Sequence, residues 1–196
     1  MWKPWVGQHY EKRKLLILGK SCYDWVDSSD DSLKSPQNDH PVMLVENQLH
    51  EPAEKNGFML KLTRALCNQT WPSPEDRQLA WQSVAFTNYV PVSVGYGARR
   101  RPAPAAWRQA ADEWPDLLEK LSPRNIIILG LSLWDNMPSP KNAAGAVGKF
   151  PQRSPAVREY VTESGNVTRC WCHWHPSAGA SADSLRDVIA EAENAA

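Results

Sequence analysis

Residues 14–19 read Lys14-Leu-Leu-Ile-Leu-Gly19, a short apolar run that stops at a glycine, and this stretch decides the fold class. The same pattern returns at Asn125-Ile-Ile-Ile-Leu-Gly130. Such runs are typical of strands that are buried on both faces of a parallel sheet. Two further β-rich stretches, 83–90 and 167–174, predict two more strands, and we expect the first of these to end near Asn88.

Helical patterns separate these strands. Apolar residues recur at three- and four-residue spacing over 103–121, which predicts a long helix that Pro115 kinks or interrupts. Shorter helices are expected at 42–49, 58–67, from Ser73 onward, at 131–136 and at 181–192, and a loop is expected over 141–165. The alternation predicts an α/β fold, with a mostly parallel four-stranded sheet flanked by helices. We expect one domain over residues 1–196, with a polar insert at about 24–56.

The composition excludes several classes of protein. Of the 196 residues, 42% are hydrophobic and 22% are charged, and the formal net charge is zero, which argues against a non-specific polycation. The longest apolar runs have about four residues, far short of the roughly 20 that span a bilayer, and the first residues do not resemble a signal peptide. Four scattered cysteines do not suit a disulfide scaffold. We therefore expect a cytoplasmic protein without a membrane partner.

Polar groups follow three of the predicted strands. They are Gly19-Lys-Ser-Cys-Tyr-Asp24, Thr87-Asn88-Tyr89 and His173-Trp-His-Pro-Ser177. Ligands of open parallel sheets bind at the carboxyl ends of the strands, so we expect these segments to meet in one cleft. An asparagine amide both donates and accepts, which suits the edge of a pyrimidine. A histidine after a strand is suited to stabilise an oxygen that gains negative charge.

In this order, the Gly and Tyr after the first strand, the Phe-Thr-Asn88-Tyr segment and the closing His175-Pro-Ser177 resemble the uracil-DNA glycosylase superfamily. The resemblance spans about residues 14–190. It implies an enzyme that flips a nucleotide of DNA into a pocket and hydrolyses its N-glycosidic bond without a cofactor. A monomer is expected.

The resemblance also implies roles for residues around the base. Asn88 matches the residue that reads the pyrimidine edge, and Tyr23 matches the tyrosine that walls off the 5-position of the base. Phe58 is the candidate for the aromatic side chain that stacks on the flipped base. His175 matches the histidine that stabilises the departing base through its O2 oxygen.

One departure concerns the attacking water. Ser21 stands where the superfamily usually has the Asp or Asn that positions this water, and Asp24 is the nearest carboxylate in the segment. Both are therefore candidate catalytic residues. Cleavage through an oxocarbenium-like state depends more on stabilising the leaving group than on a strong base, so glycosylase chemistry is compatible with this change.

Contacts to DNA phosphates are expected from Ser177 and from basic side chains near the cleft: Lys20, Arg99, Arg100 and Arg101. Alternatively, the three arginines are charged surface residues that contact only solvent. A second possible role for Lys20 is to form a Schiff base with the sugar, as the lysine of a lyase does. No metal is expected, because a strand would direct Cys170 and Cys172 to one face and His173 and His175 to the other.

The polar insert after Tyr23 and the segment Gly19–Tyr23 indicate what kind of base the protein acts on. If the insert enlarges the pocket, a lining of Trp and of acidic or amide groups would suit a base that carries a sugar. The superfamily includes a bacterial phage-defence branch that excises α-glucosylated 5-hydroxymethylcytosine, and Gly19-Lys-Ser-Cys-Tyr23 with the Asp-rich insert resembles that branch. The alternatives are a uracil-DNA glycosylase of base-excision repair and a non-catalytic nucleic-acid-binding relative. No bulky residue follows Ser177 to wedge the duplex open.

Overall fold

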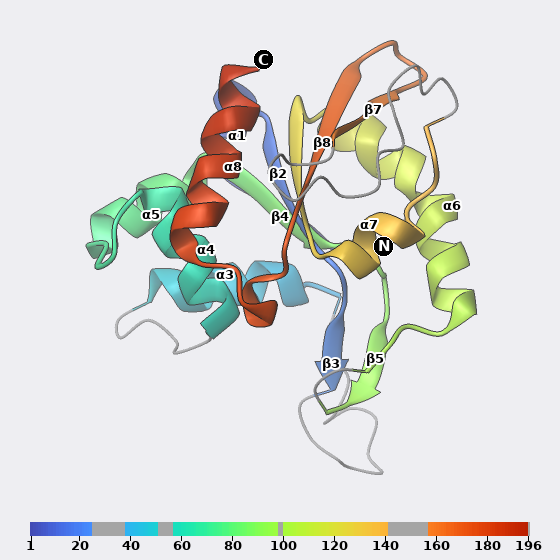
Figure 1. Cartoon of the computed structure of the whole chain (residues 1–196), viewed down its shortest axis with the longest axis horizontal. Coiled ribbons are helices and arrows are strands. Elements are labelled where there is room, and N and C mark those ends of the chain that lie inside the picture. Colours follow the sequence, from blue (N-terminus) through green and yellow to red (C-terminus); the bar gives the residue numbers. More distant parts are fainter. Residues whose placement is uncertain (25–37, 51–56, 98–99, 141–156, 196) are drawn as a thin grey trace.

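A computed structural model describes residues 1–24, 38–50, 57–97, 100–140 and 157–195 of the chain (Figure 1). The strands are β1 (Trp5–Val6), β2 (Leu15–Gly19), β3 (Cys22–Asp24), β4 (Val84–Asn88), β5 (Ser93–Tyr96), β6 (Asn125–Leu129), β7 (Val157–Val161) and β8 (Val167–His173). The helices are α1 (Tyr10–Arg13), α3 (His40–Leu49), α4 (Gly57–Cys67), α5 (Pro74–Gln82), α6 (Pro104–Leu121), α7 (Leu131–Asn136) and α8 (Ala182–Asn194), with a 3₁₀ turn, η1 (Pro176–Ala178). The chain is thus α/β, as expected.

The main sheet has six strands in the order β1-β4-β2-β6-β8-β7. Its four central strands are parallel and are the four predicted ones, whereas β1 and β7 pair antiparallel at the two edges. The sheet therefore has six strands, and the prediction of a four-stranded sheet was wrong. β1 has only two residues, and β7 is an edge strand that carries Arg158 and Glu159 and lies within the predicted loop over 141–165, so neither shows a buried strand pattern.

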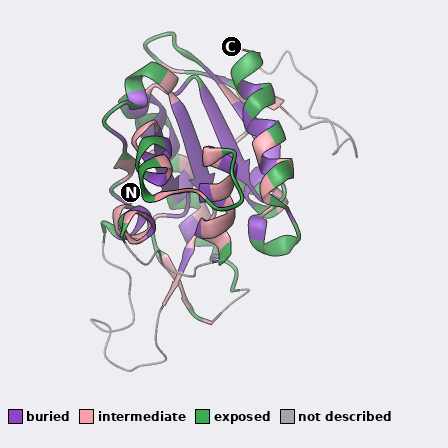
Figure 2. Ribbon diagram, turned by 90° about the vertical axis from the view of Figure 1, so that its left-hand side faces the viewer, coloured by how far each residue is buried: buried purple, intermediate pink, exposed green. Residues whose placement is uncertain are grey.

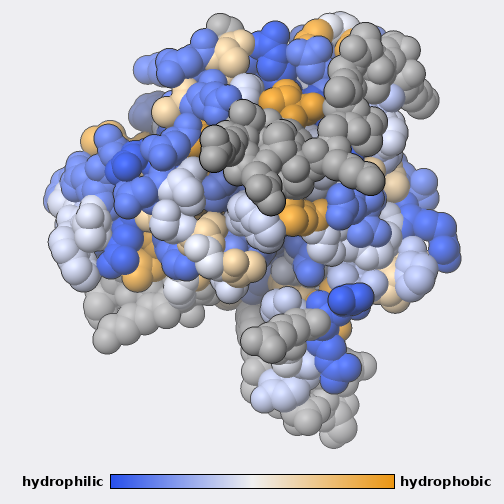
Figure 3. All heavy atoms as spheres, in the orientation of Figure 1, coloured by the Kyte–Doolittle hydropathy of each residue, from blue (hydrophilic) through white to orange (hydrophobic). Residues whose placement is uncertain are grey.

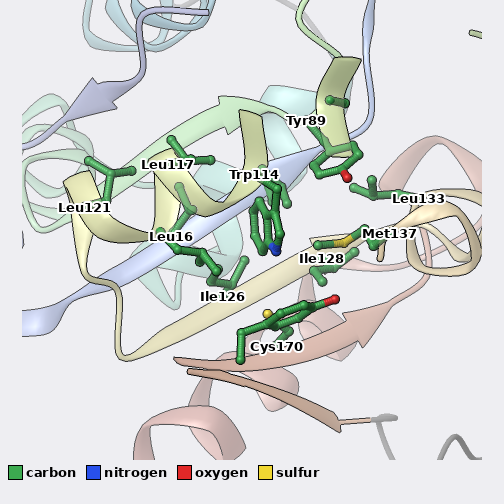
Figure 4. Close-up of a cluster of buried hydrophobic side chains, with 14 of the residues drawn as sticks. Leu16, Tyr89, Trp114, Leu117, Leu121, Ile126, Ile128, Leu133, Met137 and Cys170 are labelled. Carbon is green, nitrogen blue, oxygen red and sulfur yellow. The ribbon is translucent and has the colours of Figure 1, made fainter. Parts of the chain in front are cut away.

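Two helical layers cover the sheet (Figure 2). On one face, α3, α4, α5 and α8 pack against alternate strand residues such as Ile17, Phe86 and Leu129. On the other face, α6 and α7 pack against the intervening residues. Figure 4 shows Trp114 of α6 at the centre of this second cluster, above Ile126 and Ile128.

The helix α6 continues through Pro115, so the predicted break does not occur, while the predicted kink stays a prediction. Pro115 is exposed and directly follows the buried Trp114. The missing N–H of the proline therefore lies on the outer side of the helix, where water can satisfy the carbonyl that loses its partner.

The tryptophans divide between core and surface. Five of them are buried, namely Trp2, Trp81, Trp114, Trp134 and Trp171, while Trp71 and Trp174 are exposed. The abundance of tryptophan thus serves mainly to fill the two cores.

A two-stranded parallel ribbon, formed by β3 and β5, continues past the carboxyl end of the main sheet. The backbone N–H groups of Tyr89 and Val90 donate to the carbonyls of Gly19 and Lys20, which leads the chain from the β2–β4 pair into this ribbon. The ribbon belongs to a lobe that stands away from the main body (Figures 1 and 3). Of the predicted polar insert, residues 25–37 and 51–56 lie outside the described part, and α3 occupies most of the remainder.

None of the helices in the described ranges is long and apolar enough to cross a membrane. The assignment of the whole chain to a single domain stays a prediction.

Candidate functional site

The carboxyl ends of the four parallel strands lie along one edge of the sheet. Gly19 at the end of β2 pairs with Asn88 at the end of β4. The N–H of Gly130, just after β6, donates to the carbonyl of His173 at the end of β8, with N and O 2.8 Å apart. Strands lie about 4.8 Å apart, so Asn88 and Gly130 flank β2 at about 10 Å from each other. The ends of β4 and β6 thus lie on the two sides of the end of β2.

Asn88 is held tightly at this edge. Its side chain is 5% exposed, and a Cβ atom placed on Gly19 would lie only 2.3 Å from its Oδ1 atom. Only a glycine leaves room for the amide over the end of β2. Asn88 alternates with Val84 and Phe86, so it points to the face of the sheet that α3 and α4 cover.

His175 lies over the end of β6, on the turn between β8 and α8. A Cβ atom on Gly130 would come within 3.4 Å of the Cβ atom of His175, and Gly130 has a φ of +117°, which favours glycine. The backbone N–H of Ser177 donates to Nδ1 of His175, with the two nitrogens 3.1 Å apart. Since Nδ1 accepts this hydrogen bond, the proton of the neutral imidazole resides on Nε2. The ring therefore presents an N–H donor from Nε2.

Phe58, on α4, braces this imidazole. The two rings are stacked, with centroids 5.1 Å apart and planes at 16°, and Phe58 also contacts Phe86 of β4. The stacking fixes the plane of the imidazole, since a rotated ring would lose the contact. The resemblance implied that Phe58 stacks on the flipped base, and that role stays a prediction.

Lys61 is a site residue that the sequence analysis missed. Its Nζ donates to the carbonyl of Pro176, with N and O 2.7 Å apart, so it ties α4 to the turn that carries His175. The signal was available, because Lys61 follows Phe58 by three residues and a helix places such residues on the same face.

The pKa of His175 is lowered to about 4. Burial is the largest cause, and the positive charges of Lys20 and Lys61 add to it. The imidazole is therefore neutral at pH 7, in agreement with the hydrogen bond that Nδ1 accepts from Ser177.

This lowered pKa predicts a pH-dependent stability. Between about pH 4 and 6.5 the unfolded chain binds a proton at residue 175 that the folded chain does not, so the free energy of unfolding falls as the pH falls through this range. The contribution is about 3 kcal/mol for a shift from 6.5 to about 4. Urea unfolding of the protein and of His175→Asn at pH 7 and pH 4.5 measures it. The variant is expected to lose less stability on acidification, and equal losses would contradict the lowered pKa.

Ser21, Tyr23 and Asp24 lead from β2 into the ribbon. The Oγ atom of Ser21 is buried and has no hydrogen-bond partner among the described residues. Asp24 lies three residues further on and lines a separate hollow of about 560 Å³. The charges that shift the pKa of His175 come from the lysines, and Asp24 is not among them. The proposed roles of the three residues stay predictions, and the structure places Asp24 in the hollow.

Positive side chains border the site. Burial lowers the pKa of Lys20, and the charge of Arg101 lowers it further. Ser177, Arg100 and Arg101 are exposed, and Nε of Arg100 donates to the carbonyl of Tyr96 in β5. Arg99 lies outside the described residues. Ser177 is therefore available to solvent beside His175, and the two described arginines are exposed after the ribbon.

The cysteines are not arranged as metal ligands. Cys170 and Cys172 are buried in the core on the α6 face, and burial raises the pKa of the Cys172 thiol to about 12 and that of Cys170 further. Both are therefore protonated thiols at neutral pH. Within the described ranges no three His, Cys, Asp or Glu side chains gather in a way that would hold a metal ion.

A comparison of the chain with known protein-family models finds no match, and a comparison with curated proteins finds no similar sequence.

Proposed function

We propose that the protein is a DNA glycosylase that holds an extruded pyrimidine between Asn88 and His175 and hydrolyses its N-glycosidic bond, leaving an abasic site. The observation that supports this most is the neutral, braced imidazole of His175 at the same sheet edge as the close-packed amide of Asn88. The central sheet of four parallel strands is also what the resemblance to the uracil-DNA glycosylase superfamily implies.

The proposed reaction depends on the departing base. As the bond between C1′ and the base nitrogen breaks, the base gains negative charge on its O2 oxygen. The Nε2–H of His175 donates to this oxygen, and one such donor contributes roughly 2.7–4 kcal/mol to the stability of the transition state. Lys20 and Lys61 act on the imidazole electrostatically and favour the developing anion as well.

The sugar becomes an oxocarbenium-like cation, which water then attacks at C1′. The water loses a proton to solvent or to the departing base, so that the products are an abasic deoxyribose and the free base. Ser21 stands just after the end of β2, at the position to which the resemblance assigns the orientation of this water. A strong base is not needed when most of the bond to the leaving group is already broken.

As its substrate we propose α-glucosyl-5-hydroxymethylcytosine in phage DNA, which makes the protein an antiviral enzyme. The support is the altered segment Gly19-Lys-Ser-Cys-Tyr23 together with the hollow that follows it. Uracil is the alternative substrate.

The arginines of the run 99–101 are expected to bind DNA phosphates. Replacing Arg99, Arg100 and Arg101 with Gln should reduce the slope of log affinity against log salt by about 0.9 for each duplex phosphate that these side chains neutralise. Fluorescence anisotropy with labelled DNA at several salt concentrations measures this slope. A control protein with Lys12, Arg108 and Lys120 changed to Gln loses the same charge elsewhere on the surface. Equal slopes for the two variants would contradict the assignment.

The proposed function is tested with DNA that contains a single glucosylated hydroxymethylcytosine, a plain hydroxymethylcytosine or a uracil. After incubation and heating in alkali, strand cleavage reveals abasic sites, and mass spectrometry identifies the released base. We expect cleavage of the glucosylated strand. Cleavage of the uracil strand alone would support the repair enzyme, and binding without any cleavage would support the non-catalytic relative.

A further inference from the structure

Two exposed aromatic side chains lie along the edge that carries the proposed base site. Tyr96, the last residue of β5, is 47% exposed, and Trp174, between β8 and His175, is 52% exposed. The ribbon continues from β2 and β4, whereas Trp174 follows β8, so the sheet order β4-β2-β6-β8 places the two rings toward opposite ends of this edge. The proposed reaction uses neither of them.

Tyr96 stands between two glycines at the end of the ribbon. Gly95 and Gly97 have φ values of +90° and +96°, and a Cβ atom on either one would meet no atom of the described residues within 4 Å. The backbone on both sides of Tyr96 is therefore open, and a ligand can approach it closely.

Basic side chains accompany Tyr96. Nε of Arg100 donates to the carbonyl of Tyr96, with N and O 3.1 Å apart, so the guanidinium is held near this residue. Arg100 and Arg101 are both exposed. Besides burial, the charge of Arg101 lowers the pKa of Lys20, which brings a third cation into the group. The charges suit a phosphate backbone, and the ring suits the flat face of a base.

Trp174 borders a second hollow, of about 330 Å³. The other residues that line it are small and uncharged: Ala178, Gly179, Ala180 and Ser184. The volume lies within the range of about 300–1,000 Å³ in which proteins bind small organic groups. An indole beside small side chains leaves room for a flat, neutral ring, which is the shape of a nucleobase.

Exposed rings of this kind favour an unpaired strand as the ligand. In a duplex both faces of a base are covered by its stacked neighbours, so an aromatic side chain stacks on bases that are unpaired or splayed out. Proteins that unstack a duplex frequently insert a bulky apolar wedge between its bases. The segment after Ser177 reads Ala178-Gly-Ala-Ser181 and contains no such side chain.

The position of Tyr96 fits a strand that passes through the base site. Tyr96 pairs with Asp24, which follows Gly19 by five residues. At about 3.3 Å per residue and about 4.8 Å between strands, Tyr96 lies within roughly 18 Å of Gly19. A stacked DNA strand advances about 3.4 Å per nucleotide, so the ribbon reaches about five nucleotides from the extruded base. Trp174, which directly precedes His175, is placed to contact the strand on the other side of that base.

We propose that the protein takes its target nucleotide from single-stranded DNA, with Tyr96 and Trp174 stacking on bases to the two sides of the extruded pyrimidine and Arg100 and Arg101 contacting phosphates near Tyr96. The proposal rests on the proposed function and adds to it the strand state of the substrate and two residues that bind it. The lack of a wedge after Ser177 is then no obstacle, because an unpaired strand has no duplex to open.

The first test measures binding without catalysis. Fluorescence anisotropy with labelled oligothymidine, alone and paired with oligodeoxyadenosine, gives the affinities for the single strand and the duplex. We expect the single strand to bind about tenfold more tightly or better, because only unpaired bases offer their faces to both rings. Tyr96→Ala and Trp174→Ala should each weaken its binding by about fivefold to 150-fold, the loss of one stacked base. Tyr96→Phe keeps a ring and should bind like the wild-type protein.

Trp71→Ala is the matched control for these variants. Trp71 is 82% exposed and lies between α4 and α5, outside the proposed surface. Its replacement should leave the affinity for the single strand unchanged. Equal binding of single strand and duplex by the wild-type protein, or affinities of Tyr96→Ala and Trp174→Ala that match that of Trp71→Ala, would overturn the proposal.

The salt dependence separates stacking from phosphate contacts. For single strands, log affinity falls with log salt by about 0.7 for each phosphate that is neutralised. The two alanine variants should keep the wild-type slope, whereas a protein with Arg100→Gln and Arg101→Gln should show a smaller slope. A slope that falls as much in the alanine variants as in the arginine variant would show that the rings do not act by stacking.

The second test compares excision of the target base from a single strand and from a duplex. We expect a higher kcat/KM on the single strand, and we expect Tyr96→Ala and Trp174→Ala to reduce this advantage while Trp71→Ala leaves it intact. A preference for the duplex that is lost in the same two variants would show that the rings wedge paired DNA open, and this would overturn the proposal.

The outcomes for this surface and for the proposed function are distinguishable. Ring-dependent binding of oligothymidine without excision of any base would support the stacking surface and refute the glycosylase. Excision that is as efficient on the duplex as on the single strand, and unchanged in both alanine variants, would support the glycosylase and refute the stacking surface.

Discussion

Replacing His175 with alanine is expected to lower the rate of base excision by about 100-fold or more, with little change in the affinity for DNA. The Nε2–H donor stabilises charge that develops on the base only as the bond breaks, so its removal affects the transition state and leaves the ground state almost unchanged. Phe58 stacks on the imidazole of His175, and the N–H of Ser177 donates to its Nδ1 atom. The Nε2–H group is therefore already oriented before the reaction, and the ring does not have to reorganise in the transition state.

Single-turnover excision and anisotropy binding assays measure the two quantities. His9→Ala is a suitable control, since His9 is an exposed histidine on another part of the chain. Circular dichroism verifies that both variants are folded. Equal excision rates for His175→Ala and the wild-type protein would refute the role of His175.

Replacing Gly19 with alanine is expected to reduce excision to a similar degree, on the order of 100-fold, although residue 19 carries no functional group. The new methyl carbon would lie 2.3 Å from Oδ1 of Asn88, where ordinary contacts are longer than about 3.4 Å, so the amide must move by about 1 Å. A displacement of this size in a group that positions a substrate costs about 100-fold in rate. The backbone of Gly19 does not have a positive φ, so alanine fits the strand itself.

A double-mutant comparison separates this mechanism from a general loss of stability. In an Asn88→Ala background the methyl group has no amide to displace, so Gly19→Ala should then add little to the loss. Gly57→Ala is the matched control, because a Cβ atom at Gly57 meets nothing within 4 Å. A full additional loss in the Asn88→Ala background would show that Gly19→Ala acts through something other than Asn88.

The central sheet was predictable because its strands are buried on both faces. The apolar runs before Gly19 and Gly130 identify β2 and β6, and helix signals such as Ser73 mark the start of α5, where Ser73 and Asp76 form a capping box. The edge strands could not be predicted in the same way. β7 is partly exposed and charged, and its pairing with β8 depends on a contact that no local pattern encodes.

The site was predictable to the extent that it depends on topology. Asn88 ends β4 and His175 comes shortly after β8, and the carboxyl ends of parallel strands meet at one edge, so their placement at that edge could be expected; their roles stay predictions. The close approach of Gly19 to Asn88, the stacking of Phe58 on His175 and the hydrogen bond of Lys61 to Pro176 all join elements that are distant in sequence. Spacing along the chain does not reveal such contacts.

The most direct test of the proposed base site is a crystal structure of the protein with DNA that contains a 2′-fluorinated form of the target nucleotide. The fluorine destabilises the oxocarbenium-like state, so the intact nucleotide is retained in the site. We predict that the pyrimidine is extruded, with its edge on the amide of Asn88 and its O2 oxygen within hydrogen-bond distance of Nε2 of His175. A base bound elsewhere on the protein, or an extruded base that touches neither residue, would contradict the proposal.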